Sequence, residues 1–189
     1  MKITSRHILF TGILVLLTTA CKYFFGPNLE WSGFSPVIAI ALFSGLIIKE
    51  RNFSFILPFV ALLLSDIFIQ FLYSVNLFPY AGFYSGQWVN YSILLASTLI
   101  GWMLKGRSLA SLATGAVAAP TAYFLISNLF VWSSSVQTTY PKTFAGLMTC
   151  YEAALPFYRN SIIATLVFLP IILISYNYIT KHKTEITLA

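Results

Sequence analysis

Charged residues are scarce in this chain of 189 residues. Only 8% of the residues are Asp, Glu, Lys or Arg, against about 25% in an ordinary soluble domain. With 58% hydrophobic residues and a mean hydropathy of +0.82, the chain carries more apolar surface than a soluble fold of this size can bury. The composition therefore predicts a membrane protein whose main partner is the lipid bilayer.

The residues and motifs of many enzymes are lacking as well. The two histidines, His7 and His182, stand in the terminal segments, which excludes a buried metal site or proton relay built on histidine. No GxxxxGK[ST] loop and no HExxH motif is present, and no Ser, Cys or Lys stands in a catalytic pairing. The basic residues are scattered between apolar runs and form no patch, so nucleic acid is not an expected partner. We expect a protein that is not an enzyme and carries no cofactor.

Six apolar runs are long enough, or nearly long enough, for membrane-spanning helices of about 20 residues. They cover residues 8–25, 36–48, 55–74, 88–104, 109–131 and 160–178. None alternates as the strands of a membrane barrel do. The sequence therefore predicts an all-α, polytopic membrane protein, a six-helix transmembrane bundle that forms a single domain over residues 1–189. Cleavage of the first run as a signal peptide before Cys21 is the alternative to a retained first helix.

Lysine and arginine set the expected orientation, because cytoplasmic loops carry an excess of both. With both termini in the cytoplasm, the inner side receives eight basic residues: Lys2, Arg6, Lys49, Arg51, Lys105, Arg107, Lys181 and Lys183. The outer side then receives only Lys22, Lys142 and Arg159. We expect a multi-pass protein of the cell inner (cytoplasmic) membrane with both termini cytoplasmic.

Asp66 is the most informative polar residue, since it lies about eleven positions into the third run, ~16 Å deep by helical rise. A carboxylate at that depth costs at least ~2.5 kcal/mol and usually faces a pathway or a site. Gln70 lies on the same helix face. Polar residues also gather near the outer helix ends: Gln87, Asn90, Asn128, Arg159 and Asn160. This asymmetry predicts a water-accessible cavity that opens outward with Asp66 near its floor, whereas a purely structural Asp66 is the alternative.

The one long outer loop, residues 133–157, is expected to contain a short amphipathic helix. Thr143 is a candidate N-cap for a helix over about residues 144–155, which Pro156 would close. This helix is too short to span the bilayer and would lie on the surface or cover the cavity as a lid. Cys21 and Cys150 both map to the outer side, where two buried small apolar residues are favoured over a disulfide.

Several stretches resemble a known family. They are Ser35-Pro36-Val37-Ile38-Ala39-Ile40-Ala41-Leu42-Phe43-Ser44-Gly45, Leu62-Leu63-Leu64-Ser65-Asp66, Asn128-Leu129-Phe130-Val131-Trp132, Tyr140-Pro141-Lys142-Thr143-Phe144-Ala145-Gly146-Leu147 and Ala154-Leu155-Pro156-Phe157-Tyr158-Arg159-Asn160. They are similar to an uncharacterised bacterial family of candidate membrane transport proteins. That family in turn resembles the substrate-binding S components of energy-coupling-factor (ECF) transporters. The resemblance implies a small-molecule solute as ligand, and a membrane coupling subunit with cytosolic ATPases as partners.

The favoured hypothesis is therefore a solute-binding subunit for uptake of a vitamin or other micronutrient. In it Asp66 holds a polar or cationic group of the ligand, and Arg159 pairs with an anionic group or with Asp66. The other expected binding residues are Gln70, Asn90, Asn128 and Asn160 as hydrogen-bonding groups and Trp31 and Trp132 as stacking rings. An autonomous proton- or cation-coupled carrier and a non-transporting envelope scaffold protein remain the alternatives.

Overall fold

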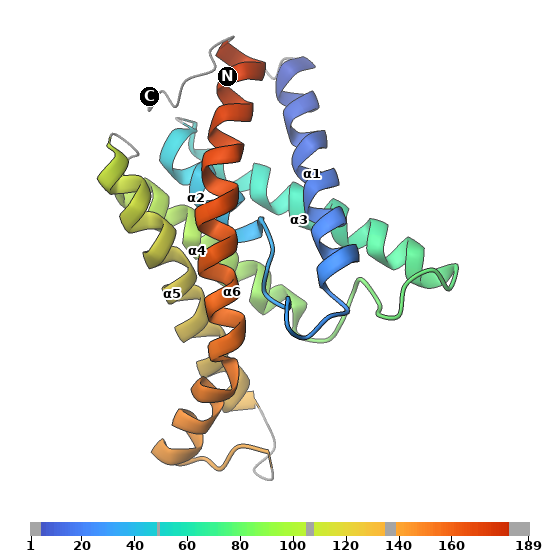
Figure 1. Cartoon of the computed structure of the whole chain (residues 1–189), viewed down its shortest axis with the longest axis vertical. Coiled ribbons are helices and arrows are strands. Elements are labelled where there is room, and N and C mark those ends of the chain that lie inside the picture. The colour runs from blue at the N-terminus through green and yellow to red at the C-terminus, as the bar shows by residue number, and fades with distance from the viewer. Residues whose placement is uncertain (1–4, 49, 105–107, 135–138, 182–189) are drawn as a thin grey trace.

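The computed structural model describes residues 5–48, 50–104, 108–134 and 139–181, and in these ranges every regular element is a helix (Figure 1). The elements are α1 Ser5–Phe25, α2 Val37–Ile47, α3 Arg51–Ser74, α4 Gln87–Leu104, α5 Leu109–Ser134, α6 Phe144–Tyr176 and a final π-helical turn, η1 Asn177–Lys181. The predicted all-α class with six helices is confirmed. Of the residues used above, Lys2, Lys49, Lys105, Arg107, His182 and Lys183 lie outside the described ranges.

Four of these helices, α1, α3, α5 and α6, are long and apolar enough to cross a membrane. Their outward-facing side chains are apolar too, among them Ile8, Leu16 and Phe24, each at least 65% exposed. A surface of this kind is stable in lipid and not in water. The chain is therefore built as a membrane protein.

The short helix α2 forms the centre of the bundle. Its 11 residues rise only about 17 Å, which is less than the ~30 Å hydrocarbon thickness. Every residue from Ile38 to Ile47 is buried, since α2 packs against α3, α4, α5 and α6. The run predicted over residues 36–48 is thus a core helix enclosed by its neighbours. Small residues let the helix backbones approach closely here, and Gly45 of α2 lies directly against Gly101 of α4.

The two ends of the described chain meet at one end of the bundle (Figure 1). Ser5, Arg6 and His7 of α1 line a shared hollow with Thr180 of η1. The described chain therefore begins and finishes at the same end of the bundle, near Ser5 and Thr180. The loops between α1 and α2 and between α3 and α4 lie toward the other end, and they build the site described below.

Helix α6 corrects one sequence prediction. A separate helix over residues 144–155, closed by Pro156, does not exist, because α6 runs unbroken through Pro156 for 33 residues, about 50 Å. A proline removes one hydrogen bond of the helix, and here packing against α5 compensates for it. The ring of Tyr158 stacks on Phe124 at 4.6 Å, and its hydroxyl lies 2.7 Å from Thr121 Oγ1.

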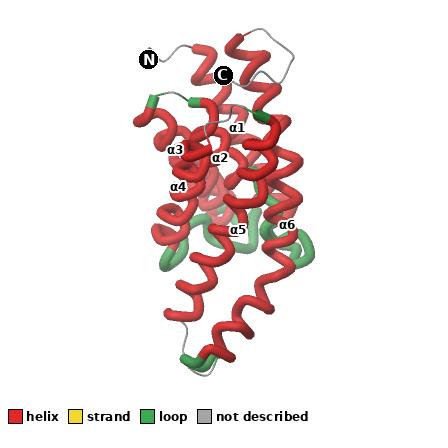
Figure 2. Tube along the Cα trace, turned by 90° about the vertical axis from the view of Figure 1, so that its left-hand side faces the viewer, coloured by secondary structure: helices red, strands yellow, loops and turns green. Residues whose placement is uncertain are grey.

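The N-cap prediction for this helix is confirmed, since Thr143 Oγ1 accepts a hydrogen bond from Gly146 N at 3.2 Å. The end of α5 and the start of α6 project together beyond the other helices (Figure 2). The segment expected to cover the cavity as a lid therefore belongs to a long helical hairpin. Cys21 and Cys150 are buried and unpaired, as expected for small apolar residues.

Candidate functional site

A cavity of about 230 Å³ lies among the helices at the end of the bundle remote from the termini. Lys22 and Asp66 are the charged residues among those that line it. The complete lining comes from all six helices and two loops: Lys22, Gly33, Ser35, Val37, Ile38, Leu62, Asp66, Tyr84, Gln87, Asn90, Tyr91, Leu94, Tyr123 and Ser161. Asp66 therefore lies in the wall of a cavity.

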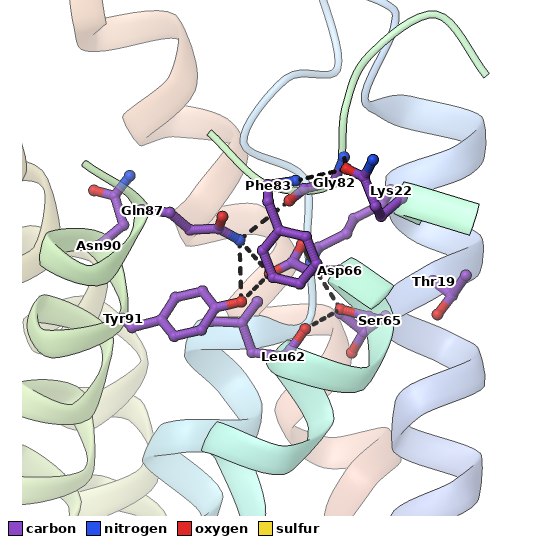
Figure 3. Close-up of polar contacts among 12 residues, drawn as sticks. Thr19, Lys22, Leu62, Ser65, Asp66, Gly82, Phe83, Gln87, Asn90 and Tyr91 are labelled. Atoms are coloured by element: carbon purple, nitrogen blue, oxygen red, sulfur yellow. Dashed lines mark hydrogen bonds and ion pairs between the residues drawn. The ribbon is translucent and has the colours of Figure 1, made fainter. Parts of the chain in front are cut away.

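The Asp66 carboxylate of α3 is held by side chains from two other helices, α1 and α4 (Figure 3). Lys22 of α1 forms an ion pair with Oδ1 and also donates to Ser65 Oγ at 2.7 Å. On the other side, Tyr91 donates its hydroxyl proton to Oδ2, and Gln87 Nε2 donates to the same oxygen at 2.8 Å. Both carboxylate oxygens thus have partners.

Position along the helices explains this arrangement. Lys22 lies in the last turn of α1, Asp66 lies in the second half of α3, and Gln87 opens α4. Because α1 packs on α3, the long Lys22 side chain reaches across to the carboxylate. Buried charges are stable when paired and hydrogen-bonded, and a lone carboxylate at this depth would be costly. The ion pair joins α1 to α3, while Gln87 and Tyr91 join α3 to α4.

The loop between α3 and α4, residues 75–86, is fixed by two glutamine side chains. Gln70 Oε1 accepts hydrogen bonds from Gly82 N at 3.0 Å and from Phe83 N at 3.3 Å. Gln87 Oε1 accepts from Tyr84 N at 3.2 Å. Gly82 is needed here, because a Cβ at this position would lie 2.1 Å from the Asp66 carbonyl oxygen. These contacts hold the loop against α3, so that Tyr84 lines the cavity.

The loop between α1 and α2, residues 26–36, is fixed in a similar way by α6. Asn160 Nδ2 donates to the carbonyl oxygens of Glu30 at 2.7 Å and Ser32 at 2.9 Å. Ser161 Oγ lies 3.2 Å from the Gly33 carbonyl oxygen, which accepts its proton. Asn160 therefore positions the loop that carries Gly33 and Ser35 into the cavity wall, and it does not itself line the cavity.

Of the eight predicted binding residues, Asp66 and Asn90 line the cavity. Gln70 and Asn160 lie behind its walls and bind loop backbone. Trp31 lies in the 26–36 loop, 46% exposed, with its ring 5.6 Å from that of Phe25.

The other three predicted residues lie elsewhere. Asn128 donates to its own helix at Phe124 O, 2.8 Å away, and Trp132 Nε1 donates to Pro141 O at 2.9 Å in the projecting hairpin. Arg159 is exposed on α6. The expected pairing of Arg159 with Asp66 is wrong, because the cation beside Asp66 is Lys22.

Sequence reasoning missed Lys22, Tyr84, Tyr91 and Tyr123 as cavity residues and did not place Gln87 in the site. One signal was available for Lys22: a lysine inside an apolar run needs an anionic partner, and Asp66 is the acidic residue within the other apolar runs. The tyrosines carried no such signal, since tyrosine at a helix end is also typical of the membrane interface.

A metal centre is not indicated. Within the described ranges, His, Cys, Asp and Glu side chains form no group of three or more that could hold a metal ion. The cavity instead offers hydroxyl and amide groups beside the ion pair of Lys22 and Asp66.

Comparison with known proteins gives a family. Residues 2–187 match the family described as "Family of unknown function (DUF6580)". No curated protein and no solved structure matches the chain. Since the match covers nearly the whole chain, the protein belongs to the DUF6580 family.

Proposed function

We propose that this protein is the solute-binding subunit of an uptake system for a micronutrient or vitamin, similar in role to the S components of ECF transporters. The observation that carries the proposal is the cavity around Asp66, enclosed by apolar helices and lined by polar side chains. Ionisable residues inside membrane helices usually mark such sites, because their burial is expensive.

In this proposal the protein resides in the cell inner membrane with both termini in the cytoplasm, so that the cavity faces outward. The sequence carries no nucleotide-binding motif of the GxxxxGK[ST] type, and the cavity shows no nucleophile and base in a catalytic arrangement. Energy for uptake would therefore come from a membrane coupling subunit and cytosolic ATPases. The protein itself would capture solute and would not act as an enzyme.

The test is whether the purified protein carries a solute in this cavity. The full chain is expressed, purified in mild detergent and extracted, and the extract is searched for small molecules by mass spectrometry. We expect one compound at a constant ratio to protein. Leu62 lines the cavity, so Leu62→Trp should displace this compound by filling the space.

Leu64 supplies a matched control on the same helix. It lines an apolar groove on the outside of α1 and α3 and is 38% exposed, so Leu64→Trp adds the same ring away from the cavity. This variant should retain the compound. Equal loss in both variants, or no bound compound in the unaltered protein, contradicts the proposal.

A second candidate, an autonomous proton- or cation-coupled carrier, is favoured by the position of a titratable carboxylate in the cavity wall. Liposomes that contain only this chain separate the two functions. Solute accumulation driven by an imposed proton or cation gradient supports the carrier, whereas binding without accumulation supports the subunit. Stable capture of envelope proteins without any bound compound would instead indicate a scaffold.

A further inference from the structure

We propose that the ligand of this cavity is an uncharged molecule of one or two small rings that bears a carboxamide-like group. The inference rests on the proposed solute-binding function and adds the chemical class of the solute. It is drawn from the charge of the cavity wall, from the polar atoms that remain open and from the size of the space.

The cavity wall has no net formal charge. Lys22 and Asp66 are the charged side chains that line it, and they neutralise each other. A ligand with a net charge would therefore bring an uncompensated charge into a site within the membrane helices, which is strongly unfavourable.

The hydrogen bonds around the ion pair also disfavour a zwitterionic ligand, which carries one positive and one negative charge. Asp66 Oδ1 accepts from Lys22, while Oδ2 accepts from both Tyr91 and Gln87. A zwitterion would have to break these hydrogen bonds to reach either charge. The geometry therefore favours a ligand that leaves the pair intact.

Three other polar groups in the wall remain open. Ser35 Oγ is buried and has no hydrogen-bond partner among the described residues. Tyr123 also lines the cavity, and its hydroxyl has no hydrogen-bond partner among the residues that the structure describes. Asn90 donates its amide nitrogen to Tyr84 Oη at 2.7 Å, so its carbonyl oxygen remains as an acceptor.

A buried polar atom such as Ser35 Oγ costs free energy unless it finds a partner, so a bound ligand is expected to supply one. Two hydroxyls and one carbonyl oxygen match a neutral group that both accepts and donates, as a carboxamide does. The aromatic rings of Tyr84, Tyr91 and Tyr123 suit a flat body beside that group.

Size limits the ligand further. A cavity volume of about 230 Å³ is below the ~300–1,000 Å³ typical of pockets for drug-sized ligands. One or two small rings with a single polar group fill such a space.

Benzamide, benzoate and benzamidine form a matched probe series, since they share one ring and carry zero, one negative and one positive charge. Their affinities for the purified full chain are measured by equilibrium dialysis in detergent. We expect benzamide to bind at least about tenfold more tightly than either charged probe, because burial of an uncompensated charge is costly.

Substitutions that change the charge of the cavity wall should then change the order of the three probe affinities. Lys22→Gln leaves the wall negative and should favour benzamidine, whereas Asp66→Asn leaves it positive and should favour benzoate. Arg159→Gln and Glu152→Gln make the same charge changes at exposed positions of α6 and should keep the original order. If Lys22→Gln does not fold, Asp66→Asn and the unaltered protein still decide the result.

The inference is overturned if the unaltered protein prefers a charged probe or binds none of the three. It is also overturned if the compound recovered from the purified protein is charged, and in that case the solute-binding function itself stands. Failure of the proposed solute-binding function has a different result, because the purified protein then carries no compound that Leu62→Trp displaces.

Discussion

Gly45 of α2 and Gly101 of α4 lie back to back at the centre of the bundle. A Cβ built on Gly101 would lie 2.9 Å from the Gly45 Cα and 2.5 Å from the Leu42 carbonyl oxygen. Backbones approach this closely in membrane proteins where both residues lack side chains. The crossing brings α4 against α2, and α4 carries the residues that bind Asp66 from that side.

Gly45→Ala should therefore destabilise the protein. The new Cβ would lie 2.0 Å from the Thr98 carbonyl oxygen, which forces α2 and α4 apart. Overpacking of this kind lowers the free energy of unfolding by about 2 kcal/mol. Unfolding in mixed micelles by titration with sodium dodecyl sulfate measures the change.

Gly12→Ala is the control, because a Cβ there meets nothing within 4 Å, and it should leave stability unchanged or raise it by up to about 1 kcal/mol. Equal effects of the two substitutions would contradict the close crossing.

Removal of Lys22 should leave the Asp66 charge buried and unpaired. We expect Lys22→Met to lower the free energy of unfolding by about 3 kcal/mol, the usual consequence of removing one partner from a buried ion pair. Adding Asp66→Asn to this variant should recover part of the loss, because no unpaired charge remains and the Asn oxygen still accepts from Tyr91. The same micelle titration measures all three proteins.

Arg159→Met removes an exposed cation and should change stability by less than about 0.5 kcal/mol. A large effect of Arg159→Met with a small effect of Lys22→Met would show that Asp66 depends on Arg159 and not on Lys22.

Gln70→Leu should loosen the loop of residues 75–86 without altering the charges of the cavity. The substitution removes the acceptor for the Gly82 and Phe83 amides. Each hydrogen bond contributes about 1 kcal/mol, so exchange of each of these two amides should accelerate about fivefold. Hydrogen–deuterium exchange with peptide-level mass spectrometry measures this change. Tyr73→Leu, at an exposed position on the same helix, should leave the loop unchanged. Unaltered exchange in Gln70→Leu would mean that other contacts hold the loop.

The orientation can be tested with a membrane-impermeant maleimide. The native cysteines are 5% and 2% exposed and should not react, so they need not be replaced. Leu29 is 78% exposed in the loop beside the cavity, and Leu29→Cys should be labelled in intact cells. Glu50 is exposed in the turn before α3, and Glu50→Cys should be labelled only after permeabilisation. The reverse pattern would place the cavity on the cytoplasmic side and remove the basis for uptake from outside.

Apolar run length predicted most of the helices from sequence, because each helix in lipid must satisfy its own backbone hydrogen bonds. The boundaries of α1, α3, α4 and α5 differ from the predicted runs by a few residues. Pro156 was misread as a helix terminus because a proline cannot donate the backbone hydrogen bond that continues a helix. In the structure, Tyr158 on one side of it packs against Thr121 and Phe124 of α5, and Tyr151 on the other side donates to Leu125 O of α5.

The sequence also could not predict the separate roles of the amide side chains. Asn90, Asn128 and Asn160 are equivalent in sequence terms, since each lies near an outer helix end. Their roles differ because different groups surround them: a tyrosine hydroxyl for Asn90, its own helix for Asn128 and loop carbonyls for Asn160. No local pattern carries that information.

The sequence by itself determined that this is an all-helical membrane protein with one costly carboxylate, Asp66, deep within one of its helices. That much follows from the energy of moving each residue from water into lipid, which depends on the residue and its position in the run. Only the tertiary structure decided that Lys22, 44 positions away, neutralises this carboxylate and that Gln87 and Tyr91 complete its shell. Such pairing depends on which helices pack together and how far their side chains reach.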